Sequence, residues 1–216
     1  MNRNTYYLVG NAHLDPLWQW RWQEGSMEAK ATIRSALDRM KEFPDFRFVC
    51  SSASVFQWVE EFAPEMLLEI KERVKENRFI IVGGWHVQPD CNLPSGEAFA
   101  RQSLYAQRYF NETFGVTATV GYCVDSFGHC ATLPMILKNS GMDSYIFMRP
   151  SPKEKDMDSD VFDWIAPDGS AVTTYRILDP YCAVFDTLEA LENRVAFLQE
   201  NTKTNLPMLP IFYGVG

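Results

Sequence analysis

Short apolar runs of strand length alternate along the chain with longer amphipathic stretches of helical length. In the first 150 residues the apolar runs are TYYLVGN, FRFVC, RFIIVGG, TATVGYCV and SYIFM. The stretches between them predict helices over about 27–43, 54–77, 95–114 and 132–140. Gly115 and Gly141 follow two of these stretches, where glycine commonly ends a helix. The alternation predicts an α/β fold with a parallel sheet and helices on both of its faces.

The pattern changes after Pro150. A charged segment, SPKEKDMDSD, precedes two apolar runs that meet at a Pro-Asp-Gly turn, which predicts a β-hairpin excursion from the sheet near 161–177. A helix is expected over about 188–200, and a final apolar strand lies in LPMLPIFYGVG. Because a buried strand that ends in glycine is an unusual terminus, we expect the natural polypeptide to continue beyond Gly216.

Composition and charge narrow the class of protein. The chain has 216 residues, of which 46% are hydrophobic, and this is ample for a buried core. Its 20 basic and 28 acidic residues give a net charge of −8 without a basic cluster, which argues against a nucleic-acid partner. No apolar run is long enough for a membrane span or a signal peptide, so we expect a cytoplasmic protein. The five cysteines show no C-x-x-C spacing and are expected to be reduced thiols.

Polar and aromatic residues gather where the predicted strands end. These positions are His13 and Asp15, the segment 85–90, the segment 125–129, and Arg149. The carboxyl ends of parallel strands meet at one edge of a sheet, where α/β proteins bind their ligands. This edge is therefore the predicted functional site.

The His13-Leu14-Asp15 sequence allows two interpretations. In extended chain the side chains of His13 and Asp15 point to the same side with Cα atoms about 6 to 7 Å apart, which suits a shared metal ion. Alternatively, Asp15 caps a helix with Pro16 at its first position, and His13 is a packed core residue. Asp125 also allows two interpretations, as a carboxylate of the functional site or as a turn residue. His129 is expected to orient a neighbour or pack rather than to bind a metal directly.

The segment 83–97, GGWHVQPDCNLPSGE, adds candidates for binding a sugar. Its two glycines permit a sharp turn or a close approach to a ligand. Trp85 offers a flat apolar face of the kind on which sugar rings sit. Asp90 can accept hydrogen bonds from hydroxyl groups, and a turn aspartate after Pro89 is the alternative.

Four segments together resemble the N-terminal catalytic domain of the glycoside hydrolase family 38 α-mannosidases, most closely the bacterial branch. They are His13-Leu14-Asp15-Pro16, GGWHVQPDCNLPSGE, VDSFGHCATLPMILKNSG and YIFMRP. The resemblance runs in order across essentially the whole chain. It implies that residues 1–216 form the N-terminal α/β catalytic domain of a longer hydrolase of carbohydrate and mannose metabolism. The implied activity is a zinc-dependent retaining α-mannosidase, with one Zn²⁺ in each catalytic domain.

The resemblance also assigns roles to residues. His13 and Asp15 match two zinc ligands, and Asp125 matches the residue that is both zinc ligand and catalytic nucleophile, forming a covalent mannosyl intermediate. The implied sugar contacts are Trp18, Arg149 and Tyr181, in addition to Trp85 and Asp90. A fourth zinc ligand and the general acid are expected beyond Gly216, so the 216-residue chain by itself is expected to be inactive.

Two other functions are compatible with the same residues. A metal-dependent carbohydrate deacetylase could use a strand-end histidine and two aspartates to activate water. A non-catalytic domain could bind sugar through the same groups. The expected partner is an α-mannoside or a mannose-containing glycan, rather than nucleic acid or a membrane. Linkage specificity and assembly into a homo-oligomer are left open by the sequence.

Overall fold

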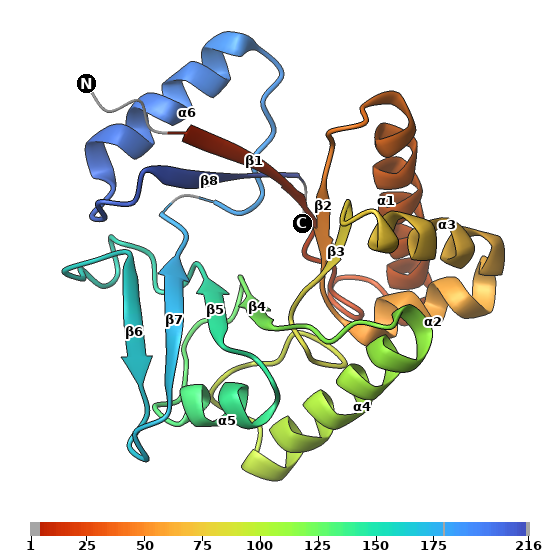
Figure 1. Cartoon of the computed structure of the whole chain (residues 1–216), viewed down its shortest axis with the longest axis horizontal. Coiled ribbons are helices and arrows are strands. Elements are labelled where there is room, and N and C mark those ends of the chain that lie inside the picture. Colours follow the sequence, from red (N-terminus) through yellow and green to blue (C-terminus); the bar gives the residue numbers. More distant parts are fainter. Residues whose placement is uncertain (1–4, 179, 215–216) are drawn as a thin grey trace.

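The computed structural model describes residues 5–178 and 180–214, and their strands form two four-stranded sheets (Figure 1). The first has the order β3-β2-β1-β8, and the second has the order β4-β5-β7-β6. The bounds are β1 (Thr5–Asn11), β2 (Phe48–Cys50), β3 (Phe79–Ile81), β4 (Val120–Cys123), β5 (Ser144–Phe147), β6 (Val161–Ile165), β7 (Ala171–Arg176) and β8 (Met208–Tyr213). Neighbouring strands are parallel except for β6 and β7, so the predicted parallel arrangement is confirmed.

The helices follow the strands in the expected alternation. They are α1 (Trp22–Glu42), α2 (Ala53–Phe62), α3 (Pro64–Lys75), α4 (Gly96–Phe114), α5 (Leu133–Asn139) and α6 (Leu188–Asn201). The hydroxyl of Ser95 accepts a hydrogen bond from the Ala98 N–H and caps α4 at its start. Gly115 ends α4 with a φ of 70°, in the left-handed region that favours glycine. In the described part of the chain, no helix is both long and apolar enough to cross a membrane.

The two sheets are joined by contacts between strand ends that curve them toward each other. The Gly83 N–H, just after β3, donates to the Val120 carbonyl of β4 at 2.8 Å. The Tyr122 hydroxyl of β4 donates to Asn11 Oδ1 of β1 at 3.0 Å, although the two residues are 111 positions apart. Both side chains are buried. These two contacts hold β4 against β1 and against the segment that follows β3.

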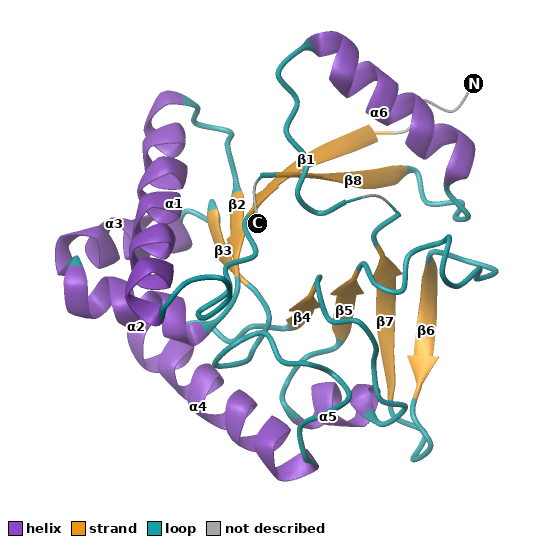
Figure 2. Ribbon diagram, turned by 180° about the vertical axis from the view of Figure 1, so that it is seen from behind, coloured by secondary structure: helices purple, strands orange, loops and turns teal. Residues whose placement is uncertain are grey.

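The curvature decides which side of the strands the helices cover. Apolar residues of strands and connecting loops pack together on the inner side. This cluster consists of Val82, Tyr122, Val124, Ile177, Tyr181 and Phe212. None of these described residues belongs to a helix. The helices lie on the outer side (Figure 2). The expected α/β fold flanked by helices is confirmed. On the inner side, the residues that pack together come from strands and connecting loops of both sheets.

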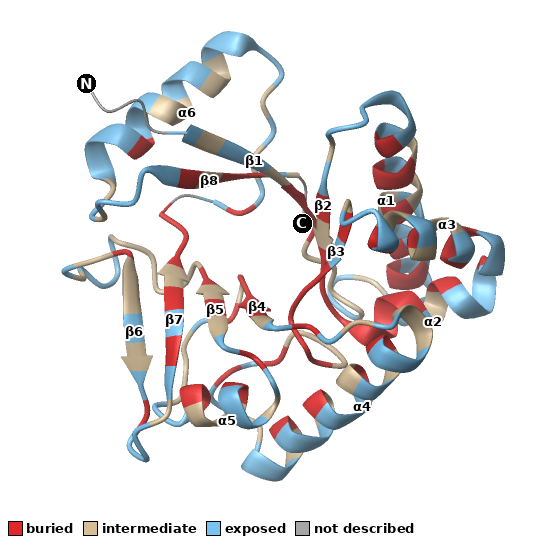
Figure 3. Cartoon of the chain, viewed as in Figure 1, coloured by how far each residue is buried: buried red, intermediate tan, exposed pale blue. Residues whose placement is uncertain are grey.

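The largest buried cluster lies between the first sheet and the helices that cover it. It contains Ile33 and Leu37 of α1, Phe56 of α2, Phe79 of β3 and Phe110 of α4. Buried positions alternate with exposed ones along each of these helices (Figure 3). This packing holds β1, β2 and β3 in one orientation, and with them the residues that follow each strand.

The predicted hairpin forms, but its second strand is a full member of the sheet. The turn is closed by hydrogen bonds between Ala166 and Ser170 and between Gly169 and Ala166, with Gly169 at a φ of 86°. β7 pairs in parallel with β5 over four residues, and only β6 runs antiparallel at the edge. The segment is therefore part of the sheet rather than an excursion from it, because β7 supplies the neighbour that β5 needs.

A buried ion pair connects β7 to two loops. Arg176 and Asp160 have side chains that are 1% and 0% exposed, with Nη2 and Oδ1 3.1 Å apart. Arg176 Nη1 also donates to the Lys155 carbonyl, and the Lys203 N–H donates to Asp160 Oδ2. The carboxylate of Asp160 therefore satisfies charged and polar groups from two other segments.

Replacing Asp160 by alanine is expected to lower the free energy of unfolding by about 3 kcal/mol, because the Arg176 guanidinium is left buried without its counter-charge. Urea denaturation followed by circular dichroism measures this change. Asp163→Ala is the control, since the Asp163 side chain is exposed and, among the described residues, its partner is the Thr173 hydroxyl, from which it accepts a hydrogen bond. Equal stability of the two variants would contradict the structural role given to the Asp160 carboxylate.

Candidate functional site

A cavity of about 300 Å³ lies at the strand ends where the sequence places its candidate residues. Segments that follow β1, β3 and β4 contribute to its wall. Its lining residues are His13, Asp15, Trp18, Gln88, Pro89, Asp90, Cys123, Asp125, Ser126 and Phe127. The cavity therefore brings together one imidazole and three carboxylates from three separate segments of the chain.

His13 and Asp15 follow β1 and are adjacent in space. Their Nε2 and Oδ1 atoms lie 3.2 Å apart, and the His13 ring meets the edge of Tyr181 at 5.6 Å between centroids. The other ring nitrogen, Nδ1, is buried and has no hydrogen-bond partner among the described residues. The capping alternative is wrong, because α1 begins only at Trp22 and Pro16 lies in a loop. The indole of Trp20 holds this loop by donating to the Asp15 carbonyl at 3.0 Å.

Asp125 follows β4 and is paired with Arg149, which follows β5. Arg149 Nε donates to Asp125 Oδ1 at 2.8 Å, and the Arg149 guanidinium lies 4.7 Å above the centre of the Phe127 ring. The hydrogen bond to Asp125 raises the pKa of Arg149, so the guanidinium keeps its charge. The ion pair fixes one oxygen of the carboxylate at the edge of the cavity.

Tyr181 lies near the same carboxylates. Its side chain is buried, and burial raises the pKa of its phenol, to which the negative charges of Asp125 and Asp15 also contribute. The Tyr181 carbonyl accepts a hydrogen bond from the buried side chain of Asn11. A phenol in this position keeps its proton and can donate a hydrogen bond.

His129 acts on the site through the chain that carries Arg149. Its Nε2 lies 2.7 Å from the Arg149 carbonyl, which can only accept, so Nε2 donates, and Nδ1 lies within hydrogen-bond distance of the Tyr145 hydroxyl, at 3.0 Å. Its ring packs against Tyr145, Phe147 and Trp164. His129 is thus an orienting and packed residue, as we expected, and it does not line the cavity.

The remaining candidates have different surroundings. Trp18 lines the cavity and is 63% exposed, so its ring is accessible. Asp90 also lines it, with Oδ1 accepting the N–H groups of Asn92 and Leu93 in a turn. The expectation for Trp85 needs correction. Trp85 is 1% exposed and packs in the core near Phe99 and Tyr145, so it offers no face to a sugar.

Gln88 belongs to the cavity wall but was not a candidate from the sequence. Its side chain donates to the Ser51 hydroxyl at 2.7 Å and accepts from the Val124 N–H at 3.3 Å. It therefore connects the ends of β2 and β4 across the loop that follows β3. Its position between the two glycines and Asp90 was the available signal, but an uncharged amide gave no reason to single it out.

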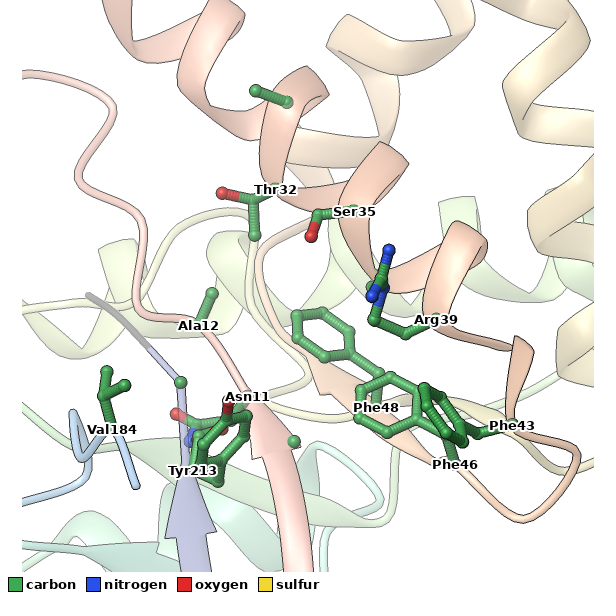
Figure 4. A pocket seen from close by; sticks show the side chains of 14 residues that line it. Asn11, Ala12, Thr32, Ser35, Arg39, Phe43, Phe46, Phe48, Val184 and Tyr213 are labelled. Carbon is green, nitrogen blue, oxygen red and sulfur yellow. The ribbon is translucent and has the colours of Figure 1, made fainter. Parts of the chain in front are cut away.

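A second cavity, of about 680 Å³, lies beside α1 and the ends of β1 and β8 (Figure 4). Phe43, Phe46, Phe48 and Tyr213 contribute its aromatic surface. Arg39 is the one charged side chain among the described residues that line it. This cavity is larger than the one at the strand ends, yet it offers no acid and base pair for chemistry.

The donors at the strand ends match some of the needs of a metal ion. Imidazole and carboxylate groups are ligands that zinc takes in proteins, and the unsatisfied Nδ1 of His13 is an atom that a bound group would satisfy. Within residues 5–178 and 180–214, however, no three His, Cys, Asp or Glu side chains are close enough together to hold an ion. The residues fit zinc in chemical kind, and the described part of the chain gives only a partial ligand set.

Comparison with known proteins identifies similar sequences and structures. The family described as "Glycosyl hydrolases family 38 N-terminal domain" matches residues 3–210. Alpha-mannosidase G of Dictyostelium discoideum is 35% identical over 81% of this chain and 16% of its own length. The alpha-mannosidase of Saccharomyces cerevisiae is 32% identical over 78% of this chain and 16% of its own length. The chain thus spans about one sixth of these relatives.

Solved structures show the same fold. An alpha-mannosidase from Enterococcus faecalis V583 superimposes over 98% of this chain and 25% of its own, with a TM-score of 0.86 at 20% identity. A putative polysaccharide deacetylase from Mycobacterium smegmatis matches 99% of this chain and 77% of its own, with a TM-score of 0.65 at 9% identity. At these identities the likeness concerns the fold alone.

Proposed function

The chain belongs to glycosyl hydrolase family 38 by its N-terminal domain, and on that premise we propose that it is the N-terminal α/β catalytic domain of a longer, zinc-dependent retaining α-mannosidase. The observation that carries the proposal is the convergence of His13, Asp15 and Asp125 on one cavity at the strand ends. The greater length of the α-mannosidases of Dictyostelium and yeast supports the longer polypeptide.

Asp125 is the proposed nucleophile. In a retaining glycosidase a carboxylate attacks the anomeric carbon while an acid protonates the leaving oxygen, and water then hydrolyses the glycosyl-enzyme. Arg149 holds Asp125 Oδ1, which leaves Oδ2 as the attacking oxygen. The general acid and a further zinc ligand are proposed to lie in the longer protein, outside residues 1–216.

His13, Asp15 and Asp125 are the residues that would hold Zn²⁺. A zinc ion held by these residues would supply Lewis-acid chemistry for hydroxyl groups of the mannosyl ring. The Tyr181 ring packs against the His13 imidazole and limits its orientation. Trp20 fixes the loop that carries Asp15.

The sugar is proposed to contact residues around this centre. The exposed ring of Trp18 would pack against the apolar face of the sugar. Tyr181 would donate to a hydroxyl, and the free oxygen of Asp90 would accept from one. Arg149 contacts the substrate region through its pair with Asp125. Trp85 is excluded from this set because it is buried.

The wider setting follows from the same proposal. The substrate is an α-mannoside or a mannose-containing glycan, and neither nucleic acid nor a membrane is required. A cytoplasmic location is proposed, supported by five cysteines that are all free thiols.

Product analysis tests the proposal. The longer protein, given an aryl α-mannoside and an N-acetylated sugar, is expected to release mannose from the first and no acetate from the second. The 216-residue chain alone is expected to be at least about 10²-fold less active, because it lacks the general acid. Acetate release without sugar release would instead support the carbohydrate deacetylase. Rapid zinc-dependent turnover by the chain alone would contradict the proposed location of the acid.

A further inference from the structure

Two buried cysteines lie side by side beneath the cavity at the strand ends. Cys91 follows β3 and is 0% exposed, and Cys123 is the last residue of β4 and is 1% exposed. Their sulfur atoms are 3.7 Å apart. The Pro89 carbonyl oxygen lies 3.6 Å from Cys91 Sγ and 3.3 Å from Cys123 Sγ. The two thiols therefore share a hydrogen-bond acceptor and face each other.

The backbone around Cys91 holds this arrangement in place. The Cys91 N–H donates to Ser126 Oγ at 2.9 Å, and its carbonyl accepts from the Cys130 N–H at 2.9 Å. Cys91 also forms a parallel bridge with His129. The loop after β3 is thereby fixed against the segment that follows β4. Since a disulfide bond is about 2.05 Å long, the sulfur atoms need to approach by less than about 2 Å to form one.

Cys123 places the pair beside the cavity. Although buried, it lines the same cavity as His13 and Asp125. The Cys91 sulfur lies 3.7 Å from that of Cys123, so both thiols are close to the cavity wall. Cys130 and Cys182, by contrast, are not part of the cavity wall.

We propose that Cys91 and Cys123 are a redox-sensitive thiol pair that closes into a disulfide when hydrogen peroxide enters the cavity. The Cys123 sulfur attacks one peroxide oxygen, the O–O bond breaks, and the thiol proton leaves with the departing oxygen as water. The Cys91 sulfur then attacks the resulting sulfenic sulfur, the S–O bond breaks, and a second water carries away the Cys91 proton. Two thiols are oxidised and one peroxide is reduced to two waters.

Closure changes the wall of the cavity. The disulfide ties the loop that carries Gln88 and Asp90 to the end of β4, two residues before Asp125. The shared contacts with the Pro89 carbonyl are lost at the same time. The proposal concerns the thiols themselves, so it stands whether or not the longer protein is a mannosidase.

Peptide mapping of the folded chain tests the proposal. Reduced protein is treated with hydrogen peroxide, unfolded, alkylated with N-ethylmaleimide and digested with trypsin. Cys91 falls in the peptide 79–101, and Cys123 shares the peptide 109–138 with Cys130. We expect these two peptides to be joined, lighter by two hydrogen atoms than their sum, with two of the five thiols no longer alkylated. Dithiothreitol should separate them again.

Variants assign the bond. Cys130→Ser is expected to keep the cross-link, because its sulfur contacts the Thr132 hydroxyl rather than Cys91. Cys182→Ser removes the exposed thiol and should also keep it. Cys91→Ser should abolish it. Full alkylation of Cys91 and Cys123 after oxidation of the folded wild-type chain, or a bond to Cys130 instead, would overturn the proposal, and neither result depends on how any variant folds.

Discussion

Replacing Asp125 by asparagine in the longer protein is expected to lower kcat for an aryl α-mannoside on the order of 10⁴-fold. An amide cannot form the glycosyl ester through which a retaining enzyme proceeds. The substitution keeps the size of the side chain and an oxygen that can accept from Arg149 Nε, so the surrounding structure should be retained. Steady-state kinetics with a chromogenic substrate measure the loss.

Asp90→Asn is the matched control. Asp90 lines the same cavity, but Oδ1 already accepts two N–H groups within its own turn, and the asparagine oxygen can do the same. A contact to a sugar hydroxyl stabilises ground state and transition state alike, so this variant should raise KM more than it lowers kcat. If Asp125→Asn kept kcat within about tenfold of the wild-type value, Asp125 would not be the nucleophile.

Replacing His13 by alanine is expected to weaken Zn²⁺ binding by the longer protein on the order of 10²-fold or more. Loss of the imidazole leaves only carboxylates as the ligands that residues 1–216 supply, whereas zinc favours nitrogen as well as oxygen. Isothermal titration calorimetry of metal-free protein gives the affinity and stoichiometry. About one zinc per wild-type chain is expected, and Asp125→Asn should weaken it as well.

His86→Ala controls for the loss of a histidine elsewhere. His86 lies in a different cavity, beside α4, and burial lowers its pKa. Its replacement should leave the zinc affinity unchanged. Equal affinity in wild type and His13→Ala, or absence of binding by a folded wild-type chain, would contradict the assignment of His13 as a ligand within this chain.

Much of the fold is visible in local sequence. Each apolar run of strand length contains a strand. Helix α4 begins after Ser95 and ends before Gly115, as capping rules predict. The start of α1 was expected near Met27, but the helix begins at Trp22. The Glu24 carboxylate accepts a hydrogen bond from the Arg21 N–H and so stabilises the first turn of α1. Glu24 was therefore the sequence signal for the earlier start, but the tryptophans before it do not follow a helical pattern.

The curvature of the sheet was not predictable in the same way. It depends on pairs such as Tyr122 and Asn11, which are far apart in sequence. The curvature also decides which aromatic residues are accessible. Trp85 and Trp18 both occur near strand ends, yet only Trp18 reaches the cavity, because Trp85 turns under α4 to pack against Phe99.

The site too was predictable from the sequence only in part. Parallel strands present their carboxyl ends at one edge of a sheet, and this rule was enough to predict that His13, Asp15 and Asp125 lie at a common site. The pairing of Asp125 with Arg149 and the approach of Cys91 to Cys123 arise from side-chain directions that spacing along the chain does not specify.

Trapping of the glycosyl-enzyme is the most direct test of the proposed mechanism. A mannosyl fluoride with a second fluorine on the ring forms the intermediate but hydrolyses slowly, because the electron-withdrawing substituent destabilises an oxocarbenium-like transition state. After reaction with the longer protein, the tryptic peptide 109–138 should gain one fluoromannosyl group on Asp125, and Asp125→Asn should gain none. An adduct on another carboxylate, or continued hydrolysis with no adduct, would contradict the account.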